Sequence, residues 1–162
     1  MPDAPAFCKW LEQSWVGGAV RESLWLFPAV ETVHLIGMAV LLATIATMDL
    51  RLLGWILGRT SVSQIFRRLL PWSWTAFAMQ VVTGMVLFSS EAVKVYDNPA
   101  FRLKMLLIVL AGFQVLIFER TVYRNVAQWD DGPPPARAKI AGGISLLLWI
   151  GIVAAGRFIG FV

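Results

Sequence analysis

The sequence predicts an all-α integral membrane protein: a four-helix bundle preceded by a short interfacial helix. Hydrophobic residues make up 58% of the 162 residues and charged residues only 15%, and the mean hydropathy is +0.70. These values are unusual for a soluble globular domain. The long apolar segments are separated by polar or proline-rich connectors. Eight tryptophans suit a protein whose helix ends lie between hydrocarbon and water.

The first element is expected over residues 4–20. Phe7, Trp10 and Trp15 recur there at helical spacing with polar residues between them, and Gly17-Gly18 break the pattern. A segment this short and amphipathic is typical of a helix lying in the membrane interface rather than spanning the bilayer.

Four spans follow, and together they form one transmembrane domain over residues 1–162. The first span is long enough to tilt or protrude, because about 30 residues rise about 45 Å against a hydrocarbon core of about 30 Å. Pro71 suits the start of the second span. Asn98 followed by Pro99 predicts a helix cap with proline in the first turn of the third span. Asp130 to Pro135, DDGPPP, separates the third span from the fourth. The predicted spans are residues 24–53, 71–95, 99–126 and 138–162.

Polar residues and small residues indicate which helix faces meet. Gln80, Thr83 and Gln114 are expected to make interhelical hydrogen bonds. The fourth span carries pairs of small residues that permit close approach of a neighbouring helix, in the bundle or in a homo-oligomer. These pairs are Ala141/Ser145, Gly151/Ala155 and Gly156/Gly160.

The distribution of Lys and Arg predicts the orientation. Eight lie in the connectors after the first and third spans: Arg51, Arg59, Arg67, Arg68, Arg120, Arg124, Arg137 and Lys139. Six lie toward the other side: Lys9, Arg21, Lys94, Arg102, Lys104 and Arg157. The bias favours a bacterial inner-membrane protein with both termini in the periplasm. We therefore attribute the formal net charge of +4 to basic residues that set the orientation in the membrane and contact the lipid bilayer, since the sequence has no nucleic-acid-binding motif.

His34, the only histidine, lies inside the first span. Ionisable residues within a membrane usually face the bundle interior and pair or bind something. A neutral imidazole is a good axial ligand for haem iron. The alternative is a structural histidine, hydrogen-bonded to Glu31 three positions earlier or to a backbone carbonyl. The single cysteine, Cys8, excludes an intrachain disulfide and a Cys-based metal cluster.

Other candidate cofactor contacts gather at the depth of His34. Lys104 opens the third span on the same side and could neutralise a haem propionate or, held deprotonated, ligate iron. Glu31, Met38 and Arg157 complete the set. Packing is the alternative for Met38, and snorkelling to the interface is the alternative for Lys104 and Arg157. Without a second histidine, the other ligand of a bound iron is Lys104, Met38, a small molecule or a residue of another subunit.

Three short motifs carry a resemblance to a known family. Leu50-Arg51-Leu52 ends the first span, Thr83-Gly84 lies in the second, and Phe101-Arg102-Leu103-Lys104-Met105 opens the third. The pattern over roughly residues 25–110 resembles the HemJ-type protoporphyrinogen oxidases and the related CopD-like and uncharacterised bacterial membrane families. The resemblance implies haem b binding and activity at His34 and Lys104, and it aligns Arg51 with the arginine that ends the family's first span, as a further catalytic candidate.

Three functions follow as hypotheses. The first is a haem-b-binding membrane redox protein, either an oxidoreductase acting on a porphyrin-like or quinone-like substrate or an electron-transfer subunit with a redox partner. The second is a non-enzymatic anchor or assembly subunit, in which His34 is only structural. The third is a small copper transport protein, suggested by intramembrane charge and the CopD-like resemblance, although the supply of copper ligands is thin.

Overall fold

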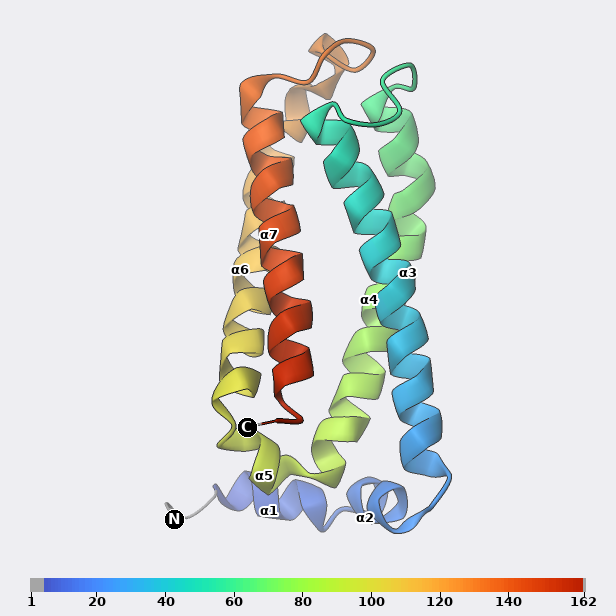
Figure 1. Cartoon of the computed structure of the whole chain (residues 1–162), viewed down its shortest axis with the longest axis vertical. Helices are drawn as coiled ribbons and strands as arrows, with labels where there is room; N and C mark the ends of the chain where they lie inside the picture. The colour runs from blue at the N-terminus through green and yellow to red at the C-terminus, as the bar shows by residue number, and fades with distance from the viewer. Residues whose placement is uncertain (1–4, 162) are drawn as a thin grey trace.

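The computed structural model describes residues 5–161 and is helical, with no strand in that range. The predicted all-α bundle is confirmed. Four long helices stand side by side: α3 (Leu26–Leu53), α4 (Val62–Ser90), α6 (Pro99–Thr121) and α7 (Ala136–Phe158). The α3–α4 and α6–α7 connectors lie at one end, called the loop end, and the α4–α6 connection through α5 lies at the other, with α1 and α2 (Figure 1). The shorter elements are α1 (Ala6–Glu12), α2 (Trp15–Glu22), α5 (Ala92–Tyr96) and the 3-10 helix η1 (Tyr123–Gln128).

Three of the long helices are long and apolar enough to cross a membrane, which indicates a multi-pass membrane protein. They are α3, α6 and α7, with mean hydropathies of 1.9, 2.0 and 1.9 over their most apolar stretch. Only 17%, 11% and 28% of those stretches are buried within the chain, so most of their apolar surface is available to lipid. Helix α4 is equally long but more polar, and it packs along α3.

Local sequence signals account for several helix ends. Pro28 lies in the first turn of α3, where its missing N–H costs little. Gly54 ends α3 with a left-handed conformation, φ +81°, that glycine adopts without strain. As predicted, Asn98 caps α6: its side chain accepts hydrogen bonds from the backbone N–H groups of Ala100 (2.9 Å) and Phe101 (3.3 Å). Helix α6 ends at Thr121, earlier than predicted, and η1 follows as a separate element.

The predicted bounds of the second span, 71–95, are wrong. Helix α4 begins at Val62, and Pro71 lies inside it. The start is fixed from the α6–α7 connector, because Asp130 accepts hydrogen bonds from the backbone N–H of Ser63 (2.7 Å) and from its hydroxyl (2.5 Å). A carboxylate at a helix N-terminus satisfies free N–H groups. The helix ends at Ser90 because Glu91 leaves the helical region, with φ −136° and ψ 36°.

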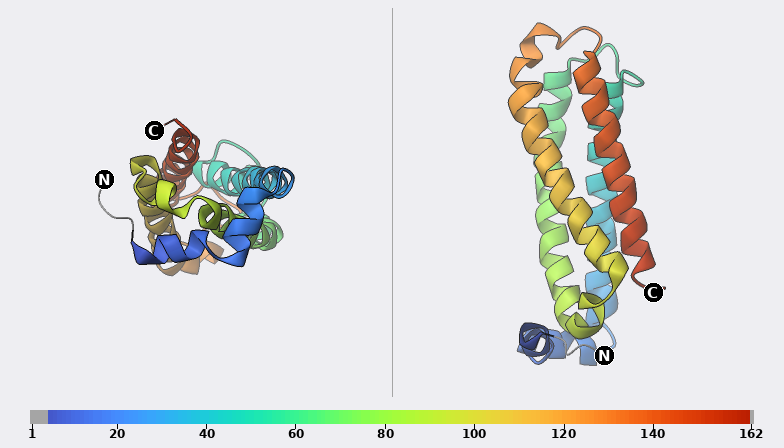
Figure 2. Two further views of the ribbon diagram at one scale, coloured as in Figure 1. Left: turned by 90° about the horizontal axis from the view of Figure 1, so that it is seen from below. Right: turned by 90° about the vertical axis from the view of Figure 1, so that its left-hand side faces the viewer.

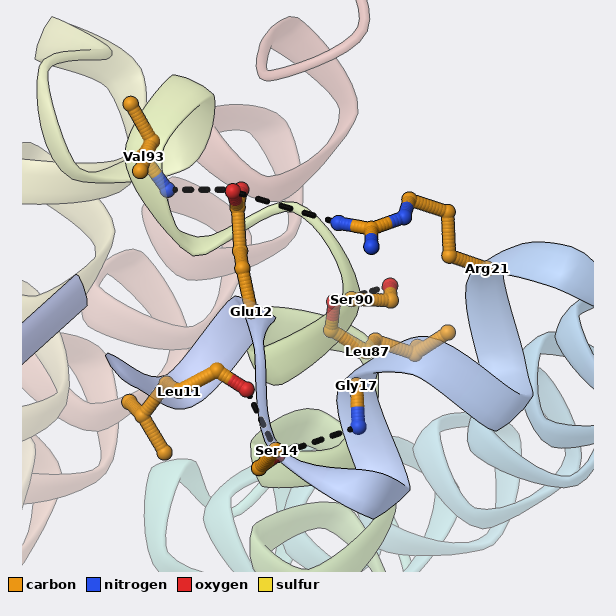
Figure 3. A network of polar contacts seen from close by, with 8 residues as sticks. All are labelled: Leu11, Glu12, Ser14, Gly17, Arg21, Leu87, Ser90 and Val93. Atoms are coloured by element: carbon orange, nitrogen blue, oxygen red, sulfur yellow. Dashed lines mark hydrogen bonds and ion pairs between the residues drawn. The ribbon is translucent and has the colours of Figure 1, made fainter. Parts of the chain in front are cut away.

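The amino-terminal segment is two helices, not the single helix predicted over residues 4–20, of which residue 4 lies outside the described part. Ser14 separates them and caps α2 by accepting from Gly17 N–H at 3.2 Å. Gly17 and Gly18 do not break the helix. Gly17 lies where α2 packs against the end of α4, and a Cβ added there would come within 2.6 Å of Ser89 O. Glu12 accepts from Val93 N–H (3.0 Å) and pairs with Arg21 (4.0 Å) (Figure 3). Helices α1 and α2 therefore lie across the end of the bundle (Figure 2).

Large side chains pack most densely at the loop end. Phe66 of α4 lies 6.0 Å from Phe118 of α6 and 5.1 Å from Tyr123, measured between ring centroids. These rings belong to a core cluster of Met48, Leu52, Val62, Ile65, Phe66, Phe118 and Ala138. Helices α3 and α7 meet closely here, since a Cβ on Gly142 would lie 2.9 Å from Asp49 O. Gly142, which lies next to the predicted Ala141/Ser145 pair, thus allows close approach of helices within the chain.

Candidate functional site

His34 is a half-buried residue of α3, and side chains of α4 hold it in place. Its Nδ1 lies 2.7 Å from the hydroxyl oxygen of Thr83, which donates its own proton to Met79 O at 2.6 Å. With that proton committed, the Thr83 oxygen accepts from Nδ1–H, and in a neutral imidazole this assignment leaves Nε2 without a proton. Gln80 donates to the backbone carbonyl of His34. The imidazole is therefore oriented with its second nitrogen free.

Glycines let helices and side chains approach closely around His34. The ring lies over Gly84, whose added Cβ would be 3.5 Å from Cε1. Gly37 lies one turn along α3, where an added Cβ would come within 2.7 Å of the Met79 side chain. These contacts fix the α3–α4 register and with it the position of the imidazole.

Lys104 lies on α6 across the bundle, at the same end, and interacts electrostatically with His34. Its side chain runs over Gly156 of α7, where an added Cβ would be 3.5 Å from Nζ. Within residues 5–161 no carboxylate forms an ion pair with it. The structure thus brings the two strongest candidates together, an oriented imidazole and an unpaired amine.

Side chains, not backbones, connect α4 to α6 at this end. No Cα atom of α4 lies within 8 Å of one in α6 among the described residues. The rings of Phe88 and Phe101 stack between them, with centroids 5.2 Å apart. Each ring lies about one turn from the site toward the α5 end, on the helices that carry Thr83 and Lys104. The stacked rings therefore join α4 to α6 beside His34 and Lys104.

The donor chemistry also fits haem. A neutral imidazole whose Nδ1–H is held by a hydrogen bond can offer Nε2 to iron, and a lysine can pair with a propionate. No group of three or more His, Cys, Asp or Glu residues that could hold a metal ion occurs in the described part of the chain.

The remaining candidates near His34 lie farther from the interior. Glu31 is exposed and makes no hydrogen bond with His34, whose partner is Thr83 instead. Met38 is half-buried one turn along α3. Arg157 is exposed, and its guanidinium lies 5.6 Å from the ring of Phe161. We therefore keep Met38 as a lining residue of the site, while Glu31 and Arg157 face outward.

Arg51 does not belong to this site. It lies 17 positions after His34 on the same helix, about 25 Å away at 1.5 Å per residue. The two residues aligned with the HemJ-type pattern as catalytic, Lys104 and Arg51, are at opposite ends of the bundle. Arg51 is buried under the α3–α4 loop, where Nε donates to Thr60 O at 3.0 Å.

Sequence reasoning identified the polar residues but not all their partners. The interhelical hydrogen bonds predicted for Gln80, Thr83 and Gln114 are confirmed, the last as a bond to Ala141 O at 3.1 Å. The pairing of Thr83 with His34 was missed. The sequence does contain a signal for this pairing, because His34 and Thr83 lie on consecutive apolar spans, each about two turns from the same end of the bundle.

Comparison with known proteins gives a family but no activity. Neither the curated proteins nor the solved structures contain a match to this chain. One family model matches residues 7–162, nearly the whole described range, including every residue of the site above. The chain therefore belongs to DUF6644, a family of unknown function.

Proposed function

We propose that the chain is a haem-b-binding redox protein of the membrane. One observation carries the proposal: His34 is fixed through Nδ1 by Thr83, which leaves Nε2 free inside an apolar helix bundle. An imidazole oriented in this way could hold iron through Nε2.

The roles of the residues follow from their positions. His34 would hold the iron, and Lys104 would neutralise a propionate or, if deprotonated, also hold the iron. Met38 would line the pocket. When bound, haem supplies a one-electron carrier, and its substrate would be porphyrin-like, quinone-like or a partner subunit. The chain's own contribution is orientation by Thr83 and exclusion of water by the stacked Phe88 and Phe101.

We further propose an orientation in the bacterial inner membrane. The eight basic residues lie in the α3–α4 and α6–α7 connectors or in the helix ends next to them, all at one end of the bundle, and α1, α2 and α5 lie at the other (Figure 1). The positive-inside rule then places the loops in the cytoplasm and His34 near the periplasmic side. Engineered cysteines at exposed positions Gly58 and Tyr96, labelled from outside with an impermeant reagent after Cys8→Ala, distinguish the two orientations.

The experiment that tests haem binding is a visible spectrum of the purified protein, expressed with adequate haem and recorded with and without dithionite. We expect a Soret band that shifts on reduction. The His34→Ala variant should lose the band, whereas the Gln114→Ala variant should keep it, because Gln114 makes an interhelical hydrogen bond elsewhere. Size-exclusion chromatography and circular dichroism confirm that both variants fold.

Two outcomes contradict the proposal. Wild-type protein without a Soret band favours the alternative of a non-enzymatic anchor or assembly subunit. A His34→Ala variant with an unchanged spectrum shows that the haem is held elsewhere. Metal analysis of the same sample separates iron from the copper expected of a transport protein.

A further inference from the structure

Arg51 is a buried cation without a counter-ion in contact. Its side chain is 1% exposed, and Nε donates to Thr60 O at 3.0 Å. Nη2 is buried with no hydrogen-bond partner, and within the described residues no carboxylate forms an ion pair with the guanidinium. Unpaired buried charge is costly, so a guanidinium in this state is incomplete without an anion.

The nearest carboxylates do not satisfy it. Asp130 interacts with Arg51 electrostatically, but its two oxygens are already bonded to Ser63. Asp49, two positions earlier on α3, interacts with Ser145 of α7 and leaves its own Oδ2 unpaired. Neither side chain supplies the two parallel acceptors that a guanidinium fork prefers.

A hollow of about 350 Å³ adjoins Arg51 at the loop end. Its wall is formed by Arg51 and Lys139, by Leu53 at the end of α3, by residues 54 and 58 of the α3–α4 loop and by residues 131–134 of the α6–α7 connector. This volume is roughly ten times that of one water in the liquid, which is enough for an oxyanion and its remaining hydration. Three of the lining residues are glycines, which have no side chain to fill the hollow.

The loop over the hollow also holds a strained residue. Leu57 has φ +52°, in the left-handed region that a branched apolar residue seldom adopts. An added Cβ on neighbouring Gly58 would meet nothing within 4 Å, so the loop is open on that side. Strained backbone of this kind clusters at ligand clamps.

We propose that this hollow binds a phosphate-type oxyanion, with the Arg51 guanidinium as its bidentate partner and Lys139 as a second positive charge. The anion is either the phosphate of an anionic lipid headgroup or a soluble phosphate. The hollow lies where the helices end, which is the level of lipid headgroups. The site is about 25 Å from His34 along α3, so it is independent of the haem proposal.

The test uses the full-length protein in nanodiscs and measures its thermal unfolding at constant ionic strength. The arms are phosphatidylcholine alone, phosphatidylcholine with phosphatidylglycerol, and phosphatidylcholine with inorganic phosphate. Saturable stabilisation by phosphatidylglycerol alone identifies a lipid headgroup, and saturable stabilisation by phosphate identifies a soluble oxyanion. Stabilisation by neither overturns the proposal.

Four variants locate the binding. Arg51→Gln should weaken it by about tenfold or more, because the bidentate partner is lost. Lys139→Gln should weaken it by about fivefold, the effect of one basic residue near a membrane surface. Asp131→Asn removes a lining negative charge and should tighten binding. Arg59→Gln, an exposed cation of the same loop outside the hollow, is the control and should change nothing.

The outcome does not depend on Arg51→Gln folding. Lys139 and Asp131 are exposed, so their variants carry the test alone if the Arg51 variant is unstable. If Arg59→Gln weakens binding as much as Lys139→Gln, or if Asp131→Asn weakens it, the interaction is diffuse surface charge and the proposed site is wrong.

Discussion

Replacing Thr83 with valine isolates the hydrogen bond that orients His34. Valine keeps the shape of threonine but removes the oxygen that accepts from Nδ1–H at 2.7 Å. The imidazole N–H is then left without its partner in a half-buried position between two helices. Interhelical hydrogen bonds in membrane proteins contribute about 0.6 kcal/mol on average and up to about 1.7 kcal/mol. The Thr83 bond connects two helices inside the bundle, so we expect a loss of about 1 kcal/mol.

Thr75→Val is a matched control on the same helix. Its hydroxyl donates to the carbonyl four residues earlier, Pro71 O at 2.9 Å, just as Thr83 donates to Met79 O. Thr75 is exposed and has no partner on another helix among the described residues. The difference between the two variants therefore reports the bond to His34 and not the change in helix propensity.

The assay is unfolding of the purified protein in mixed micelles by titration with sodium dodecyl sulfate, followed by tryptophan fluorescence. If haem binds as proposed, Thr83→Val should also weaken haem affinity by about tenfold or more, the usual cost of losing a partner behind a metal-binding histidine. Equal unfolding free energies for Thr83→Val and Thr75→Val would refute the assignment of this hydrogen bond.

Two further predictions concern packing and pH. Gly142→Ala should destabilise the bundle by about 1–3 kcal/mol, because the new Cβ would lie 2.9 Å from Asp49 O. Gly112→Ala is the control and should not destabilise it, because its Cβ would have no neighbour within 4 Å. The sodium dodecyl sulfate titration measures both variants. For Asp130, burial favours the neutral form, but hydrogen bonds from the Ser63 side chain and backbone outweigh it and hold the pKa below the ordinary value of 3.8. The stabilisation by its carboxylate is therefore complete above about pH 4 and lost as pH falls through the depressed folded-state pKa. An Asp130→Asn variant measured between pH 6 and 3 should lack that component, and an unchanged pH profile would contradict the capping role.

Features set by neighbouring residues were predictable from the sequence. The start of α6 follows from Asn98 and Pro99, because a capping side chain and a fixed proline φ act within one turn. The α6–α7 break follows from the DDGPPP run in the same way. The placement of His34 and Lys104 at one end follows from counting helix lengths between turns. All of these depend on local chemistry or on helix rise alone.

Features set by distant contacts were not predictable. The start of α4 depends on Asp130, which reaches Val62 and Ser63 only after α6 has returned to the loop end. The pairing of Thr83 with His34 depends on the α3–α4 register, fixed by the close approach at Gly37. The burial of Arg51 depends on how the α3–α4 loop folds over it, and helical periodicity carries no information about a loop.

The two ends of the bundle differ in a way that bears on where ligands bind. At the loop end, large side chains from α3, α4 and α6 fill the interior, and what is left open is a polar hollow beside a buried guanidinium. At the other end the buried apolar residues are mostly small, among them Ala92, Ala100 and Ala155, and the interior groups His34 and Lys104 remain half-buried. A large planar apolar group needs the second environment and a small oxyanion needs the first. The two proposed ligands would therefore not compete for space, because about 25 Å of α3 separates His34 from Arg51.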